Sequence, residues 1–448
     1  MERINQVNPQ HADPDALFAD HLDAQLSRYF DAMERCHHDA LVIAAGEPAL
    51  HFLDDMPVSF KPNPHFRVLT PLHPAEGSSI VLRPGQRPVL LHLRPRDFWH
   101  LSPEPATGTW TEGFEIQEYA SPEALQQGRD TLIKGANAAA FIDPDAAPAP
   151  ARLLAHLDHS RAQKTGYEIA CLALANHRAA KGHRAARDAF RAGEAEFGIH
   201  MAYLSASSQE DAELPYGNII ALNEHAAVLH YQHRQRQLPP GGSRSFLIDA
   251  GATERGYAAD VTRTYSATAG AFADLITALD TAQRDLIESI RPGMDFVNLH
   301  RAAHLAVGRI LGDAGIARGD PEALLSSGVT GAFLPHGLGH LIGVQTHDVG
   351  GRLADAEGGL RPPPESFPAL RLTRTLIEDV VVTIEPGLYF IPMLLEALRH
   401  SGESARIDWS AVDALIPFGG IRIEDNVQVT AAGCVNLTRP ALAAEGLA

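Results

Sequence analysis

Residues 245–265 read SFLIDAGATERGYAADVTRTY. Two strand-like runs, 246–248 and 258–265, flank a turn placed at Glu254 and Arg255, so the pattern predicts a β-hairpin. With that centre, Asp249 and Asp260 are expected to face each other directly. Like charges in that position destabilise a sheet, and a bound cation between them would remove the repulsion. The alternative is that one Asp simply caps or solvates a strand end.

Two glutamates stand in similar settings. Glu385 follows the β-branched run 380–384 and is stopped by Pro386, while Glu424 lies in the strand-like stretch 419–427. Strand alternation places Arg422 on the same face as Glu424. One interpretation is an exposed ion pair, which contributes little to stability. The other is a buried carboxylate, which needs a charge partner or a metal.

A glycine-rich stretch presents histidines. Residues 335–340 read PHGLGH, and His347 follows seven residues after His340. The spacing of His336 and His340 resembles the HExxH motif, but Gly337 replaces the glutamate and two glycines disfavour a helix. A zincin site is therefore excluded, and a tight loop that presents imidazoles is expected. Because the chain has 23 histidines, this signal is weak by itself.

The candidates combine into a set with metal-binding chemistry: Asp249, Asp260, His340, Glu385 and Glu424. Four carboxylates balance the charge of two divalent cations. Oxygen-rich ligation with one imidazole favours Mn²⁺, with Co²⁺ and Zn²⁺ as alternatives. Two such ions hold a hydroxide and stabilise a tetrahedral intermediate. The set predicts metal-assisted hydrolysis.

Composition narrows the class of partner. The chain has 37 Lys and Arg against 55 Asp and Glu, a net charge of −18, which disfavours nucleic acids and anionic membranes. Residues 1–6 are polar and unlike a signal peptide, and no apolar run is long enough to span a membrane. The three cysteines lie far apart, as in proteins of a reducing compartment. A cytoplasmic location is therefore expected.

The order of segments predicts an α+β protein of two domains. The first third has a helical pattern at 13–36 and strand-like runs at 41–44, 79–82, 89–93 and 139–142. Three prolines in 143–150 interrupt the pattern, and we place a boundary near residue 160. A long helix is expected over 165–192. Strands at 245–248, 380–384 and 421–429 and helices at 271–290 and 295–314 follow.

Taken together, these stretches resemble the pita-bread metallopeptidases and are most similar to the bacterial Xaa-Pro dipeptidases, a branch that includes organophosphorus acid anhydrolases. The resemblance covers nearly the whole chain and rests on residues 215–218, 245–251, 257–265, 335–351, 383–390 and 417–426. It implies an N-terminal creatinase-like α/β domain at 1–160 and a C-terminal pita-bread catalytic domain at 161–448. It also implies a homodimer in which one N-terminal domain helps to close the partner's site.

The resemblance implies roles for individual residues. Asp260 and Glu424 would bridge two metal ions, Asp249 would complete one shell, and His340 and Glu385 the other. Glu385 would also act as general base, and His347 would stabilise the intermediate or assist proton transfer. The residues implied in substrate binding are His230, His336, Arg371 and Arg422, with Arg374 as a competitor for the role of Arg371.

The implied activity is hydrolysis of small peptides, the Xaa-Pro dipeptides. A hydroxide that bridges the two metal ions would attack the carbonyl carbon of the Xaa-Pro bond. Creatinase is excluded because it lacks the five ligands, and methionine aminopeptidase normally lacks so large an N-terminal domain. Two alternatives stay open. Aminopeptidase P acts on longer Xaa-Pro peptides, and the same hydroxide in an apolar pocket could hydrolyse organophosphate triesters as a main or side activity.

Overall fold

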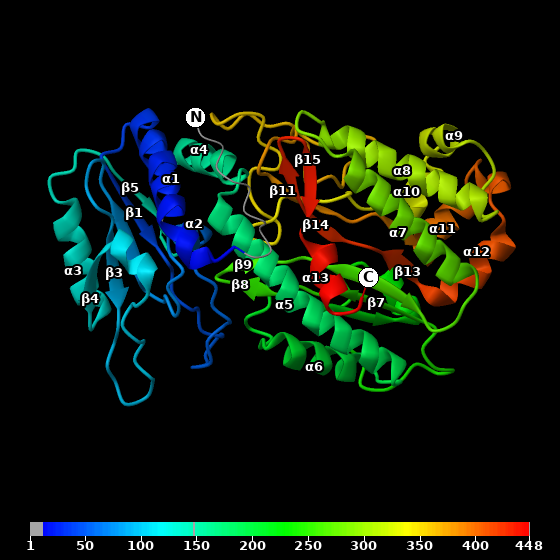
Figure 1. Cartoon of the computed structure of the whole chain (residues 1–448), viewed down its shortest axis with the longest axis horizontal. Helices are drawn as coiled ribbons and strands as arrows, with labels where there is room; N and C mark the ends of the chain where they lie inside the picture. The colour runs from blue at the N-terminus through cyan, green and yellow to red at the C-terminus, as the bar shows by residue number, and fades with distance from the viewer. Residues whose placement is uncertain (1–11, 147, 448) are drawn as a thin grey trace. The chain divides into compact units, whose positions relative to one another are not determined.

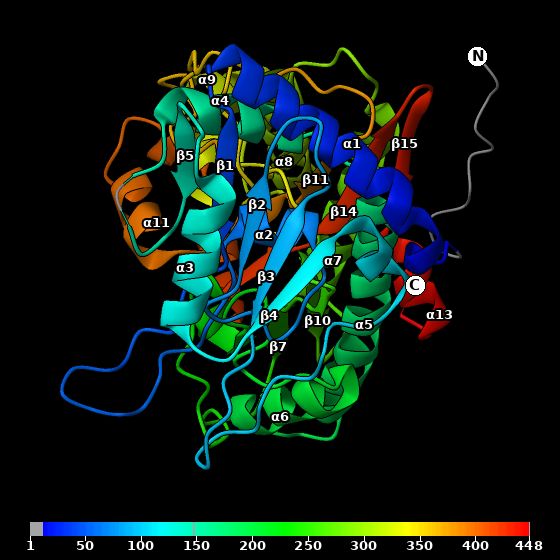
Figure 2. The ribbon, with the colours of Figure 1, turned by 90° about the vertical axis from the view of Figure 1, so that its left-hand side faces the viewer.

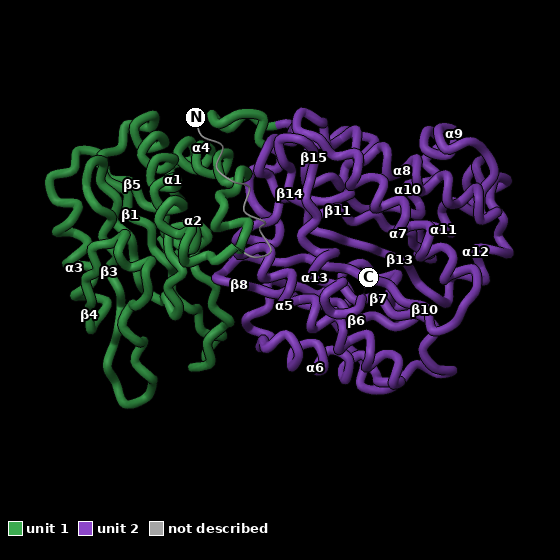
Figure 3. Tube along the Cα trace, in the orientation of Figure 1, with its two compact units in different colours: residues 1–170, 353–360 green, residues 171–352, 361–448 purple. Residues whose placement is uncertain are grey.

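Two compact units make up the chain in the computed structural model, which describes residues 12–146 and 148–447 (Figure 3). Unit 1 comprises residues 1–170 and 353–360, and unit 2 comprises 171–352 and 361–448. The polar start noted above, residues 1–6, lies outside the described residues. Helix α4 (Ala151–Arg161), which follows the prolines, packs against helix α1 (Pro14–Arg35) of unit 1.

Unit 1 is built on a five-stranded mixed sheet of order β4-β3-β2-β1-β5 (Figures 1 and 2). β1 pairs antiparallel with β2 and parallel with β5, and β3 pairs parallel with β4. The three inner strands consist mainly of apolar residues, and every residue in them is buried, as expected for strands covered on both faces. Sequence patterning missed the polar edge strand β4. The strands are β1 Ala40–Ala44, β2 Ser79–Leu82, β3 Val89–Leu93, β4 Glu115–Tyr119 and β5 Ala139–Ile142.

An N-cap side chain and a proline in the first turn define the beginning of helix α1. The Asp13 carboxylate accepts a hydrogen bond from the Asp15 N–H at 3.0 Å, and Pro14 occupies the first turn of α1. Helix α3 packs over β2, β3 and β4 through Leu125, which shares a core with Val42 and Val81. The remaining helices are α2 Pro64–Leu69, η2 Thr109–Gly113 and α3 Pro122–Ile133.

Unit 2 contains short antiparallel sheets enclosed by helices (Figure 1). β7 lies between β6 and β10, and β14 lies between β11 and β15. An isolated β-bridge between Thr262, in β10, and Glu424, directly before β14, links these two sheets. The strand predicted over 421–429 is divided at Ile423 and Glu424. The strands are β6 Ile219–Leu222, β7 Ser245–Asp249, β8 Thr253–Glu254, β9 Tyr257–Ala258, β10 Thr262–Ser266, β11 Val381–Ile384, β12 Gly387–Tyr389, β13 Gly420–Arg422, β14 Asp425–Thr430 and β15 Gly433–Asn436.

Three long helices lie close to their predicted positions: α5 Gly166–Arg191, α7 Ala271–Ser289 and α8 Phe296–Asp313. Helix α6 Glu196–Ser207 was not predicted. Shorter ones are η3 Asn223–Ala227, α9 Pro321–Ser326, α10 Val329–Phe333, α11 Pro392–Arg399, η4 Ser404–Arg406, α12 Trp409–Leu415, η5 Ile416–Phe418 and α13 Thr438–Ala444. Within the described part of the chain, none of the helices combines the length and the apolar character that crossing a bilayer requires.

Candidate metal centre

The hairpin that carries two of the carboxylates forms with a register different from the predicted one. Asp249 pairs with Thr262, not with Asp260. The turn is centred on Arg255 and Gly256, which have φ values of 50° and 88°. A two-residue turn of this kind needs positive φ at both positions, and glycine adopts it readily. The prediction that Asp249 and Asp260 face each other directly is therefore wrong.

The observed register nevertheless keeps both aspartates on one side of the hairpin. Ala250 N–H donates to the Val261 carbonyl at 3.0 Å, and Ala259 N–H donates to the Ala252 carbonyl at 2.8 Å. Asp260 is thus opposite Gly251, two positions from Asp249, which makes the aspartates diagonal neighbours. Both side chains are buried.

Strand β14 fixes the backbone at Asp260. The Asn426 side chain accepts a hydrogen bond from the Asp260 N–H at 3.1 Å and donates one to the Asp260 carbonyl at 2.7 Å. Glu424 is held by a neighbouring residue, since its N–H donates to the Thr262 carbonyl at 3.0 Å and its Oε2 accepts from the Thr262 hydroxyl at 2.7 Å. Sequence patterning had assigned no role to Thr262 or Asn426.

His340 lies in the predicted glycine-rich loop with a defined orientation. Its N–H donates to the Thr383 hydroxyl at 3.1 Å, and its Nδ1 bonds to the Leu341 carbonyl at 2.9 Å. Nδ1 therefore carries a proton, and Nε2 faces Asp260 Oδ2 at 3.4 Å and Glu385 Oε1 at 3.8 Å. Gly339 is required here because a Cβ would lie 1.9 Å from the Thr383 carbonyl oxygen.

The structure brings the predicted ligands together. Donor atoms of Asp260, His340 and Glu424 lie within 4.8 Å of one another, and all three side chains are buried. Glu385, at the end of β11, joins them through its approach to His340. Asp249 lies close enough to Asp260 for their charges to interact.

So much negative charge perturbs every carboxyl group of the cluster. Burial and then the neighbouring carboxylates raise the pKa of Glu424 well above its usual range. Burial raises the pKa of Glu385 to about 7, although the charge of His340 opposes the rise. Asp260 is the exception, because its hydrogen bond and ion pair with His340 outweigh burial and lower its pKa. The four carboxyl groups cannot all ionise here without added positive charge.

The hydrogen bonding of the Asp249 carboxylate indicates that the cluster can accommodate a cation. Asp249 Oδ2 accepts from Arg422 Nη2 at 2.6 Å, whereas the buried Asp249 Oδ1 has no hydrogen-bond partner among the described residues. A buried carboxylate oxygen needs a partner. Oxygen donors with one imidazole suit divalent cations, and their binding would displace the proton from Nε2 of His340.

The other predicted histidines lie around this cluster. The His347 ring packs edge-on against His340, with ring centroids 4.4 Å apart. His347 is exposed to solvent on one side, yet the protein atoms crowding its ring, followed by the charges of His340 and Arg371, lower its pKa to about 4. Burial likewise lowers the pKa of His336 to about 3. Both rings are therefore neutral near neutral pH.

Arg422 is buried inside the cluster. Its guanidinium donates to Asp249, to the Tyr389 hydroxyl at 2.5 Å and to the Thr262 hydroxyl at 3.3 Å. Tyr389 also bonds to His336 Nε2 at 3.0 Å, while His336 Nδ1 bonds to the Gly337 carbonyl at 2.8 Å. This chain of hydrogen bonds connects Arg422 to His336. Tyr389 was not predicted, since an isolated tyrosine after a strand carries no distinctive spacing.

Arg371 and Arg374 differ in their surroundings. Arg374 is buried and donates to the Gly350 carbonyl at 3.3 Å. Arg371 is exposed, and its positive charge acts on His347. His230 is also exposed, and its charge acts on both His336 and His347. Tyr216, another residue without a predicted role, is partly buried, with its hydroxyl in the interior; burial and then the charge of Asp249 raise its pKa.

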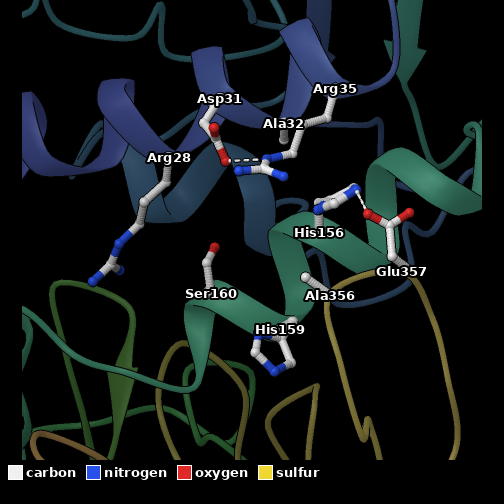
Figure 4. A pocket seen from close by; sticks show the side chains of 9 residues that line it. All are labelled: Arg28, Asp31, Ala32, Arg35, His156, His159, Ser160, Ala356 and Glu357. Carbon is white, nitrogen blue, oxygen red and sulfur yellow. Dashed lines mark hydrogen bonds and ion pairs between the residues drawn. The ribbon is translucent and has the colours of Figure 1, made fainter.

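A cavity of about 330 Å³ in unit 1 contains none of these residues (Figure 4). Its charged groups are already matched: Arg35 pairs with Asp31 at 2.8 Å, and His156 lies 3.3 Å from Glu357. The chemistry is therefore in unit 2. The cavity is lined by Arg28, Asp31, Ala32, Arg35, His156, His159, Ser160, Ala356 and Glu357.

The fold and the cluster define a hydrolase of the metal-dependent class. Sequence comparison agrees, because residues 170–431 match metallopeptidase family M24 and residues 16–158 match the N-terminal domain of Xaa-Pro dipeptidases. A curated Xaa-Pro dipeptidase of Xanthomonas campestris pv. campestris (strain 8004) is 48% identical over 433 residues, 96% of this chain and 98% of the relative. One of Stenotrophomonas maltophilia (strain R551-3) is 45% identical over 440 residues, again 96% and 98%.

Solved structures show the same fold at greater sequence distance. Zinc-substituted aminopeptidase P of E. coli in complex with product aligns with a TM-score of 0.68 at 21% identity, covering 97% of this chain and 98% of that one. Proline aminopeptidase P II of Yersinia pestis aligns with a TM-score of 0.67 at 22% identity, covering 97% and 99%. The chain belongs to metallopeptidase family M24, in its Xaa-Pro dipeptidase branch.

Asp260→Asn should lose at least one metal ion per chain and nearly all turnover, because the carboxylate lies at the centre of the cluster. Elemental analysis of the purified protein and a dipeptide assay measure both. Asp313→Asn, at the exposed end of α8, is the matched control. Two retained ions with activity near that of the wild type would refute the ligand assignment.

Proposed function

We propose that this chain hydrolyses Xaa-Pro dipeptides with the help of divalent cations. The observation that carries the proposal is the buried group of Asp260, His340 and Glu424 in a chain 48% identical to a curated Xaa-Pro dipeptidase. The experiment that tests it is an assay of Xaa-Pro dipeptide hydrolysis before and after treatment with a chelator, with Mn²⁺ added back.

We assign two divalent ions to five residues: Asp249, Asp260, His340, Glu385 and Glu424. The oxygen-rich donor set supports Mn²⁺, with Co²⁺ and Zn²⁺ as alternatives. When bound, such ions polarise the scissile carbonyl and make water a nucleophile at neutral pH. Asp260 and Glu424, whose donor atoms lie within 4.8 Å of one another and of His340, are the candidates for bridging.

Glu385 suits the role of general base. A general base must lie beside the attacking water, and Glu385 Oε1 lies in the cluster, 3.8 Å from His340 Nε2. The Glu385 side chain is partly accessible, unlike that of Glu424. Glu385 would take a proton from the attacking water and deliver it to the proline nitrogen that leaves.

The neutral histidines and exposed cations would bind the substrate. His347 and His336 are held beside the cluster in neutral form, so each can donate or accept a hydrogen bond at the reacting carbonyl. His230 would contact the substrate from the exposed side. Arg422 remains a predicted substrate group, although its contacts with Asp249 and Tyr389 support a role in orienting the cluster.

Only a dipeptidase must capture the carboxylate of proline, and Arg371 is our candidate for this task. Among the described residues, no hydrogen bond or ion pair is recorded for its guanidinium, in contrast to Arg374. A planar guanidinium binds a carboxylate through two parallel hydrogen bonds. This requirement separates the chain from aminopeptidase P, which accepts longer peptides.

Two exposed apolar loops of unit 1 support a homodimer. β1 and β3 both pair antiparallel with β2, so they run in the same direction and their C-terminal ends lie at the same end of the sheet. The loop after β1 exposes Phe52 and Leu53, each at least 90%, and the loop after β3 exposes Trp99 at 77%. Exposed apolar side chains on neighbouring loops mark interaction surfaces, and a second copy of the chain would cover them.

The acidic net charge and cysteine spacing support a cytoplasmic location.

His347→Ala should keep both metal ions and lower kcat by about 10²–10³-fold, the usual effect of removing a group that stabilises a reaction intermediate. Metal content and single-substrate kinetics are measured on the same preparation. Loss of metal with an unchanged rate per ion would show that His347 and His340 have exchanged roles.

Arg371→Ala should raise KM for an Xaa-Pro dipeptide about tenfold or more, because a charge-assisted hydrogen bond of about 1.5–3 kcal/mol is lost. KM for the same dipeptide with an amidated carboxyl group should change little. Arg301→Ala, an exposed arginine on α8, is the control. Equal wild-type rates on the dipeptide and on an Xaa-Pro-Xaa peptide would instead assign the chain to aminopeptidase P activity.

Replacing Phe52 and Trp99 together by Asp should reduce the mass in solution from that of two chains to that of one, because buried charges oppose association. Light scattering after size exclusion measures the mass. Met393→Asp changes an exposed apolar residue of unit 2 and should leave the dimer intact. A wild-type protein with the mass of one chain would contradict the proposed dimer.

A further inference from the structure

Glu196, at the start of α6, is a buried carboxylate outside the metal cluster. Only 1% of the residue is exposed. Oε1 accepts hydrogen bonds from the Leu222 N–H at 2.9 Å and from His225 Nδ1 at 2.6 Å. Oε2 accepts from the Tyr231 hydroxyl at 2.7 Å and from the Gln235 N–H at 2.7 Å. Four donors on two oxygens satisfy a buried carboxylate in full.

All four donors belong to one segment, residues 222–235, which carries His230 between them. Leu222 and His225 precede His230, whereas Tyr231 and Gln235 follow it. The ring of His225 stacks on that of Tyr231, with centroids 4.5 Å apart and planes 19° apart. The carboxylate therefore fastens the segment on both sides of His230, while the His230 side chain itself is exposed.

An ordinary helix cap does not explain these contacts. The position before α6 is occupied by Ala195, which makes no side-chain cap. The Glu196 oxygens bind no N–H of the helix, only groups of the 222–235 segment. Burial and the hydrogen bond to Glu196 raise the pKa of Tyr231, so its hydroxyl keeps the proton that it donates.

We infer that Glu196 is a positioning residue that fixes the 222–235 segment so that His230 contacts the substrate. It acts through His225 and Tyr231 and not on the reacting atoms. The inference rests on the proposed function, in which His230 is a substrate group. It adds a residue that no motif of the sequence had indicated.

Glu196→Gln provides the test, because the amide keeps the shape but replaces one acceptor oxygen by a donor. Whichever end the NH₂ group occupies, it faces a backbone N–H, of Leu222 or of Gln235, which cannot accept, so at least one of the four hydrogen bonds is lost. We expect KM for an Xaa-Pro dipeptide to rise about tenfold, with kcat changed less than threefold and metal content unchanged. Faster hydrogen–deuterium exchange over 222–235 should accompany the rise. Glu213→Gln, an exposed carboxylate before β6, is the matched control.

A double-mutant cycle with His230→Ala separates positioning from general destabilisation. If Glu196 acts through His230, adding Glu196→Gln to His230→Ala should raise KM less than twofold further. Equal effects of Glu196→Gln in both backgrounds, or loss of metal, would overturn the inference while dipeptide hydrolysis by the wild type stands. Absence of that hydrolysis would instead refute the proposed function. If Glu196→Gln does not fold, Tyr231→Phe removes a single hydrogen bond and should show a smaller rise in KM with the same dependence on His230.

Discussion

Like-charge repulsion among Asp249, Asp260, Glu385 and Glu424 is the constraint on which the rest of unit 2 depends. Removing a carboxylate from water costs several kcal/mol unless a counter-charge is near. His340 and Arg422 are the basic groups within the cluster, and together they do not balance four negative charges. Burial, and then the neighbouring carboxylates, raise the pKa of Glu424, and burial raises that of Glu385. One buried oxygen of Asp249 has no hydrogen-bond partner among the described residues. Divalent cations resolve the charge imbalance and bring the chemistry of hydrolysis with them.

Hydrogen bonds and ion pairs from several strands hold the carboxylates of the cluster in place despite their mutual repulsion. Thr262 binds Glu424 through both backbone and side chain, and Asn426 binds the backbone of Asp260 on both sides. Behind them, Arg263 pairs with the buried Asp425 at 2.6 Å, and the charges of Arg263 and Arg439 lower the pKa of Asp425 to about 2 against the effect of burial. These contacts fix the backbone around the cluster. Such pre-organisation is what a site needs to bind cations in one geometry.

Strand periodicity and residue chemistry were enough to predict most elements and the identity of the cluster. The four apolar strands of unit 1 and the long helices form where expected, because burial dictates their patterns. The hairpin register was wrong because the turn is set by Gly256, which permits positive φ one residue later than assumed. The polar strand β4 carries no periodic apolar signal. Contacts between distant residues, such as those of Tyr389 with Arg422 and of Glu196 with Tyr231, depend on tertiary structure and have no local pattern to reveal them.

We propose that the carboxylate cluster holds two divalent ions. Diffraction from crystals grown with Mn²⁺, recorded on both sides of the manganese absorption edge, locates such ions directly. Two anomalous peaks per chain are expected, both near Asp260 and Glu424 and one of them near His340. A cluster without a peak, or a single peak remote from Asp260, would contradict this proposal.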